Sequence, residues 1–175
     1  MVKKSFSDMD CSLAQSMDVI GEWWSMLILR DFFIGKGQRR FEQLRDSLGI
    51  SRNILTERLK TLTDAGVIER VPLQEGGKRC FYQLTEKGRD LLPILVAITQ
   101  WWDRWERDPE DRFLITRDRE FNEEIAPVKV TSARGKSLGW GELYMTVRTP
   151  HGEIKIPQWP LNMGALAEED LEKVG

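Results

Sequence analysis

The sequence predicts a mainly α-helical domain with a small β wing, plus a small strand-rich C-terminal appendage. Apolar residues recur at helical spacing through most of the chain up to Arg107. Two short runs with strand character, Val67–Leu73 and Arg79–Leu84, flank a Gly-containing turn within that pattern. From about residue 111 the sequence becomes charged and then strand-like. We therefore predict two domains, at residues 1–110 and 111–175.

Four helical segments precede the wing. Cys11–Ile20 carries apolar residues at helical spacing. Trp23–Phe33 is apolar on nearly every side, so we expect it to be the buried central helix. Phe41–Leu48 is a short amphipathic helix that Gly49 ends. The fourth helix, Ser51–Ala65, begins at a serine whose hydroxyl can accept a hydrogen bond from the first helical turn.

One long helix is predicted after the wing, from Thr85 to about Arg107. Pro93 lies inside it and predicts a kink, because proline removes one backbone donor. In the appendage we expect strands at Val128–Thr131, Glu142–Thr149 and Glu153–Trp159, and a short helix at Ala165–Val174.

The third and fourth helices are joined by a tight turn at Gly49–Ile50 and followed directly by the two strands. This order is typical of a winged helix-turn-helix, whose second helix lies in the DNA major groove. On that helix Leu55, Leu59 and Leu62 share one side and must face the core. Arg58, on a flank, should pair inside the fold or contact the DNA backbone. The predicted DNA-binding residues are Arg52, Asn53, Thr56, Glu57 and Lys60 on the helix, Lys78 and Arg79 at the wing tip, and Arg40 before the motif.

These side chains suit duplex DNA. Asn pairs with adenine, Glu accepts from cytosine, and basic side chains bind phosphates or enter a narrow minor groove. The chain has a net charge of −2, but Lys36–Lys60 holds seven basic and three acidic residues, a local charge of +4. We therefore predict double-stranded DNA as the partner. Polar helix faces are often merely solvated, and winged folds also dock proteins, so a docking module without DNA binding is the alternative.

Composition disfavours other classes of protein. The chain has two isolated cysteines, Cys11 and Cys80, and one histidine, so we expect no metal site, no cofactor and no enzymatic activity. No apolar run approaches the roughly 20 residues that span a membrane. The expected protein is cytoplasmic and not membrane-bound.

Several motifs in order resemble the HxlR family of bacterial winged-helix regulators. They include Asp18–Trp24, Ile28–Asp31, Arg40–Leu44, Leu55–Lys60, Gly66–Arg70 and Tyr82–Gly88. The resemblance, over about Cys11–Trp105, implies a dimeric DNA-binding repressor or activator that often answers to reactive electrophiles or oxidants. We expect a repressor, with a small-molecule effector as a further candidate partner. The Gly-rich wing departs from the family's usual proline-rich, acidic wing, and the tail lacks the cysteines of some longer members.

The resemblance also makes Cys11 a candidate redox sensor. A cysteine at this position is the sensor in some members, and the start of a helix favours the reactive thiolate. The alternative is that Cys11 is a small buried hydrophobic residue held for packing. For Cys80 we favour packing.

The long helix carries a heptad-like apolar seam that predicts a homodimer. Its residues are separated by four, three, four and three positions. A two-fold partner would bury the seam, whereas the alternative is that the helix packs on its own domain or on the tail. The predicted dimer-interface residues are Leu91, Leu95, Ile98, Trp102 and Trp105.

Overall fold

The computed structural model describes residues 5–74, 79–149 and 152–155. The chain divides into two compact units between Val128 and Lys129, hereafter the first and second units. None of the described helices is long and apolar enough to cross a membrane.

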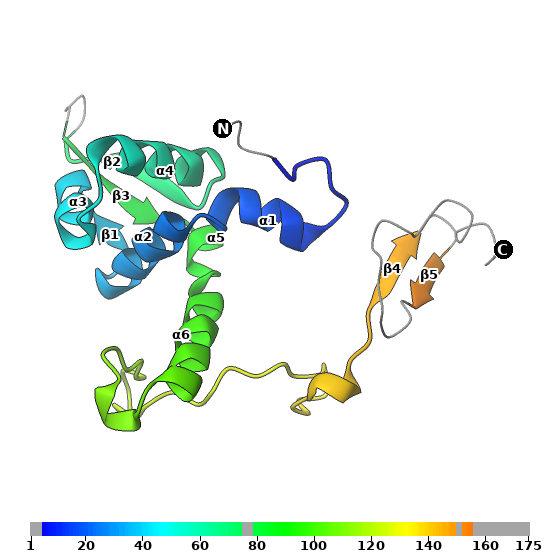
Figure 1. Ribbon diagram of the computed structural model, residues 1–175. Helices are drawn as coiled ribbons and strands as arrows, with labels where there is room; N and C mark the ends of the chain where they lie inside the picture. The colour runs from blue at the N-terminus through cyan, green and yellow to red at the C-terminus, as the bar shows by residue number, and fades with distance from the viewer. Residues whose placement is uncertain (1–4, 75–78, 150–151, 156–175) are drawn as a thin grey trace. The chain divides into compact units, whose positions relative to one another are not determined.

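The first unit begins with four helices in the predicted order (Figure 1). Each begins and ends within one residue of its expected bounds, because the Ser51 cap of α4, glycines and apolar spacing mark these ends in the sequence. The helices are α1 (Ser12–Ile20), α2 (Trp23–Ile34), α3 (Phe41–Leu48) and α4 (Arg52–Asp64).

The wing is a three-stranded antiparallel sheet in the order β1-β3-β2. Strand β2 (Ile68–Pro72) pairs with β3 (Cys80–Leu84), with Ile68 opposite Leu84. The predicted hairpin is therefore present. Strand β1 (Gln38–Arg39) was not predicted, and it pairs with the other side of β3. This pairing anchors the wing to the turn that separates α2 from α3.

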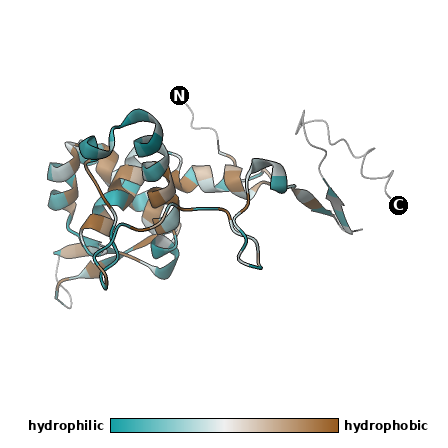
Figure 2. Cartoon of the chain, turned by 90° about the horizontal axis from the view of Figure 1, so that it is seen from below, coloured by the Kyte–Doolittle hydropathy of each residue, from teal (hydrophilic) through white to brown (hydrophobic). Residues whose placement is uncertain are grey.

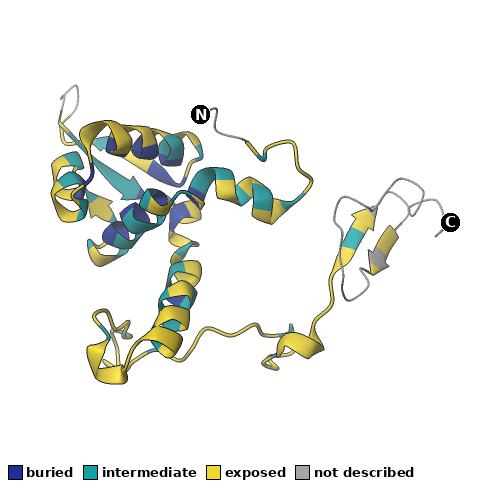
Figure 3. Ribbon diagram, in the orientation of Figure 1, coloured by how far each residue is buried: buried dark blue, intermediate teal, exposed yellow. Residues whose placement is uncertain are grey.

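The core of the first unit surrounds α2. Ile28, Leu29 and Phe32 are fully buried, and they pack with buried residues of α3, α4 and the sheet. Figure 3 shows the buried residues gathered in these elements, and Figure 2 shows apolar residues concentrated there. The mainly α fold with a small β wing is confirmed, and α2 is the buried central helix that we expected.

The predicted long helix is in fact two helices, α5 (Glu86–Arg89) and α6 (Leu92–Glu106). The helical conformation is interrupted at Asp90 and Leu91, and Pro93 lies in the first turn of α6. Inside a continuous helix, the proline ring would clash with the carbonyl four residues earlier, at Arg89. A proline in the first turn has no such conflict, so the kink that we predicted takes the form of a new helix start.

A glycine lets α5 lie directly against the start of the wing. Gly88 is buried, and a Cβ atom built on it would lie 2.1 Å from the backbone oxygen of Val67. The Thr85 hydroxyl accepts a hydrogen bond from the Gly88 N–H at 3.1 Å and donates to the Gly66 carbonyl at 2.7 Å. Only a residue without a side chain fits at position 88 with this spacing.

Residues 111–128 belong with the first unit, whereas we predicted a domain boundary after residue 110. The Gln100 side chain on α6 donates to the Ala126 carbonyl at 3.3 Å and accepts from the Val128 N–H at 2.7 Å. Arg112 forms an ion pair with Glu124. A short 3₁₀ turn, η1 (Pro109–Asp111), leads from α6 into this irregular segment.

The described residues of the second unit form a 3₁₀ turn and one hairpin. These are η2 (Trp140–Glu142), β4 (Thr146–Thr149) and β5 (Gly152–Lys155), with the two strands antiparallel. The expected strand at Val128–Thr131 is reduced to a single bridge between Thr131 and Ser137. The rest of the strand predicted to Trp159 and the helix predicted at Ala165–Val174 lie outside the described residues.

Candidate nucleic-acid interface

The turn between α3 and α4 fixes the direction of α4. Gly49 has a φ of 61°, a left-handed conformation that glycine adopts without a Cβ penalty. Ile50 is 3% exposed and anchors the turn in the core. Ser51 then caps α4, its hydroxyl accepting from the Ile54 N–H at 3.4 Å.

The two sides of α4 differ as the helical spacing predicts. Leu55, Leu59 and Leu62 are buried against the core. The opposite face is exposed, and no other described part of the first unit covers it. The exposed residues on α4 include all five that we predicted to contact DNA, namely Arg52, Asn53, Thr56, Glu57 and Lys60.

Three of these five side chains are held by ion pairs. The Arg52 Nη2 lies 3.0 Å from the Glu42 Oε1 of α3, and its guanidinium lies 5.1 Å from the centre of the Phe41 ring. Lys60 pairs with Asp64, and Glu57 pairs with Arg58. The sequence analysis missed Glu42, because its ten-residue separation from Arg52 gives no local signal. The positive charge on this face is therefore largely balanced within the free protein.

Arg58 pairs inside the fold, which is the first of the two roles that we expected. The residue is 5% exposed, so in the free protein its side chain is buried and does not face the surface on which DNA would lie. Its Nη2 contacts Glu57, while Nε and Nη1 are buried with no hydrogen-bond partner in the described residues. The helix thus carries a buried charge among its leucines.

Asn53 and Arg79 differ from the paired residues. Both are exposed, and neither side chain makes a hydrogen bond or ion pair within the described residues. Arg79 directly precedes β3 at the tip end of the hairpin, where its carbonyl accepts from the Leu73 N–H at 2.9 Å. Arg40 is exposed at the start of α3, and its N–H donates to the Gln43 side chain at 2.8 Å. Lys78, the other predicted wing residue, lies outside the described residues.

The predicted dimer seam is divided between two environments. Leu91 and Leu95 are partly buried against the core of their own unit. Ile98, Trp102 and Trp105 are 50%, 49% and 65% exposed. The structure thus places the first two residues of the seam where our alternative expected them and leaves the other three open.

The two cysteines occupy different surroundings. Cys11 is partly exposed at the N-cap of α1. Cys80 is partly exposed in β3, and the Arg70 Nε donates to its sulfur at 2.8 Å. This hydrogen bond raises the pKa of the Arg70 guanidinium. In the described part of the chain, no three His, Cys, Asp or Glu side chains come together as a metal site.

These features define a class of protein. Two helices joined by a tight turn, the second polar on its exposed face and followed by a β-hairpin, form a winged helix-turn-helix. Residues 19–110 match the family model described as HxlR-like helix-turn-helix. The chain belongs to this family, as its motifs indicated.

Relatives and solved structures agree with the assignment. The chain is 36% identical over 127 residues to the uncharacterized HTH-type transcriptional regulator Rv3095 of Mycobacterium tuberculosis, covering 73% of this chain and 79% of that protein. The crystal structure of PA1607, described as a candidate transcription factor, matches with a TM-score of 0.72 and 37% identity over 80% of this chain and 96% of that one. A second structure, of PA1374 from Pseudomonas aeruginosa, is also described as a candidate transcription factor. It matches with a TM-score of 0.56 and 31% identity, and the match covers 78% of this chain and 92% of that one. The protein is a transcriptional regulator of the helix-turn-helix class.

Proposed function

We propose that the protein is a homodimeric repressor that binds a specific duplex DNA site with α4 in the major groove. The observation that carries this proposal is the uncovered polar face of α4, which directly precedes the wing. In this docking mode, Asn53 and Glu57 contact base edges, while Arg52, Thr56 and Lys60 contact bases or phosphates. Arg40 and the wing residues Lys78 and Arg79 contact the phosphates of the flanking DNA.

The dimer is proposed from the exposed apolar end of α6. Ile98, Trp102 and Trp105 leave large apolar surfaces in water, and each tryptophan ring can bury on the order of 150–250 Å². A two-fold pairing of this surface buries it. It also places two α4 helices on one side of the DNA, about one helical turn apart.

We propose repression because a dimer that occupies a promoter excludes other proteins from the same DNA. This action takes place in the cytoplasm, where the DNA partner lies. It requires no catalytic group, and the relative Rv3095 is named as an HTH-type transcriptional regulator.

Binding to a fluorescent duplex selected from random sequences tests the proposal. We expect Asn53→Ala to weaken binding to the selected site by about 1–3 kcal/mol, because it removes a base contact. Binding to unselected DNA should weaken far less. Lys60→Ala should weaken binding to selected and unselected DNA alike. It should also reduce the slope of log affinity against log salt concentration by about 1. Lys129→Ala, which removes the same charge from the second unit, is the matched control.

The competing hypothesis is a winged module that docks a protein and does not touch DNA. A folded wild-type protein that shows no salt-dependent duplex binding would support that hypothesis and reject ours. If Lys60→Ala and Lys129→Ala had equal effects on duplex binding, α4 would not be part of the DNA interface.

A further inference from the structure

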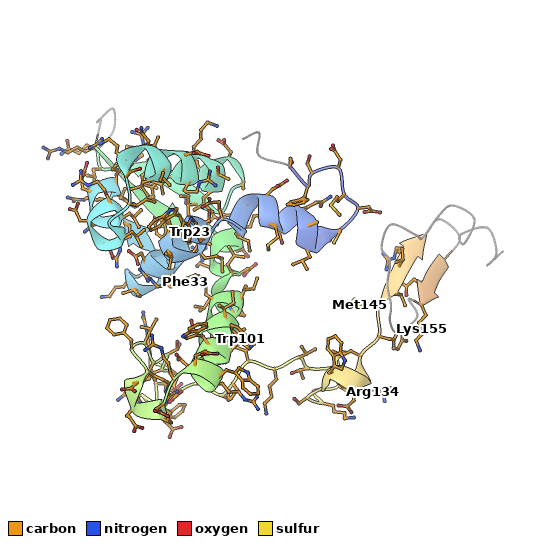
Figure 4. All side chains as sticks on the ribbon, viewed as in Figure 1. Trp23, Phe33, Trp101, Arg134, Met145 and Lys155 are labelled. Carbon is orange, nitrogen blue, oxygen red and sulfur yellow. The ribbon has the colours of Figure 1, made fainter. Side chains whose placement is uncertain are left out.

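A cavity of about 730 Å³ lies within the first unit, and none of its lining residues belongs to α4. The end of α2, the following turn, one face of α6 and the segment 114–119 form its walls. Phe33, labelled in Figure 4, contributes from the end of α2. The apolar part of the lining also includes Leu95, Val96, Leu114 and Ile115. The volume falls in the range of about 300–1,000 Å³ that is typical of small-molecule sites.

The polar part of the lining is strongly one-sided. Five cationic side chains line the cavity, and no Asp or Glu is among the lining residues. They are Arg30, Lys36, Arg89, Arg117 and Arg119. They come from four separate parts of the chain, so the fold, not local sequence, gathers them.

Most of this charge is not neutralised inside the protein. Arg30 pairs with Asp31 at 2.7 Å, which offsets one of the five charges. Within the described residues, Arg89 and Arg117 donate to the backbone carbonyls of Leu84 and Asn122, each at 2.9 Å. The pKa of Glu124 is lowered chiefly by its hydrogen bond with Arg112 and further by the charge of Arg117, so Glu124 offsets part of the Arg117 charge. Hydrogen bonds to carbonyls leave the guanidinium charge in place, and an arginine has further donors to offer. Within the described residues, no ion pair holds Lys36 or Arg119.

The apolar walls are also incompletely covered. Ile34 is 54% exposed, and Leu92 and Leu114 are 41% and 39% exposed. A ligand that satisfies both parts of the lining needs an apolar body and an anionic head. We propose that this cavity binds an organic acid, with the apolar body against Phe33, Leu95 and Val96 and the acid group facing Lys36 and the arginines.

The cavity is placed to act on DNA binding, and this part rests on the function proposed above. It is lined by α2 in the core, by α6, and by Leu84 at the end of β3 in the wing. Leu92, Val96 and Thr99 of α6 line it, while the exposed Ile98 and Trp102 lie on the neighbouring face of that helix. A ligand that favours one angle between α6 and α2 would change the spacing of the two α4 helices and hence DNA affinity.

The probe for the test is 1-anilinonaphthalene-8-sulfonate, a fluorescent organic acid with an aromatic body. We expect saturable binding to the full chain, at least about fivefold weaker in the Lys36→Gln, Arg119→Gln double variant. The double variant Lys129→Gln, Arg134→Gln removes the same charge from the second unit, outside the cavity, and should bind normally. N-phenyl-1-naphthylamine, which has the same aromatic body without the sulfonate, should not distinguish the variants. Thr116→Trp, which fills the cavity, should abolish the saturable binding of the sulfonate.

Each result decides the proposal. Equal binding of the sulfonate by wild type and the Lys36→Gln, Arg119→Gln variant would overturn the site, because the probe would then bind an exposed apolar surface. A second measurement, duplex affinity with and without saturating probe, should show a change of about fivefold or more in wild type only. An unchanged duplex affinity would overturn the regulatory role. Duplex binding without probe tests the proposed function separately, so the two failures are distinguishable.

Discussion

At the residue scale, two contacts with α3 restrain the side chain of Arg52. Its guanidinium pairs with Glu42 and lies over the Phe41 ring, so α3 holds the side chain in the free protein. Both partners of the ion pair are more than half exposed, and exposed pairs contribute only about 0.2–1 kcal/mol. A phosphate can therefore replace Glu42 as the partner of Arg52 at small cost.

Removing the competing carboxylate should strengthen DNA binding. We predict that Glu42→Gln raises duplex affinity about two- to fivefold at low salt, because Arg52 no longer has to leave an ion pair. Titration of a labelled duplex by anisotropy measures the change. Glu110→Gln, the same charge change on η1, separates this local effect from the general gain in positive charge. If both variants behaved alike, the Arg52–Glu42 pair would play no part in binding.

The thiol prediction also belongs to single residues. If Cys11 is the sensor, diamide should change duplex affinity of the wild-type protein about fivefold or more, and Cys11→Ser should not respond. Cys80→Ser should keep the response, since Cys80 lies in β3 with its sulfur bonded to Arg70. Loss of the response in Cys80→Ser with retention in Cys11→Ser would transfer the sensor role to the wing.

At the scale of elements, the sequence predicted the features that depend on residues close together in the chain, such as the orientation and start of a helix. The leucine stripe of α4 and the cap at Ser51 gave its orientation and its start, so the exposed candidate residues followed from the sequence. Strand β1 could not be found, because two residues become a strand only through pairing with β3. The partner of Arg52 and the cover over Leu91 and Leu95 were equally non-local.

The close contact of α5 with Val67, the residue before β2, gives a prediction about stability. A methyl group at Gly88 would overlap the Val67 carbonyl, so α5 would have to move away from the wing. We expect Gly88→Ala to reduce the free energy of unfolding by about 1–3 kcal/mol, as overpacking does. Urea unfolding measures this change. Gly141→Ala, where an added Cβ meets nothing within 4 Å, should change stability by less than about 0.5 kcal/mol.

At the scale of the whole molecule, contacts and composition divide the chain differently. The composition changes near residue 111, but Gln100 ties the segment as far as Val128 to α6. Such side-chain bonds leave no periodic trace in the sequence. The first unit therefore holds the DNA-binding candidates, the apolar end of α6 and the cationic cavity together.

Assembly is the property to test at this scale. We predict that a double variant, Ile98→Asp with Trp102→Asp, sediments as a monomer where the wild type sediments as a dimer, because like charges would meet across the two-fold axis. Its DNA affinity should fall, since one half-site contact is lost. Trp140→Asp changes a tryptophan that is 96% exposed in the second unit and should leave the mass unchanged. A wild-type protein that is monomeric at all concentrations would contradict the prediction.

The ion pairs on α4 have a consequence for how such a regulator searches a genome. Wrong sites outnumber the operator by about a million to one or more, and all of them offer phosphates. Arg52 and Lys60 already have carboxylate partners, so an arbitrary stretch of duplex attracts them less than it would attract unpaired cations. The same pairs must open at the operator, so they lower the affinity for every duplex and leave sequence selection to side chains such as Asn53, which has no ion pair to give up within the described residues.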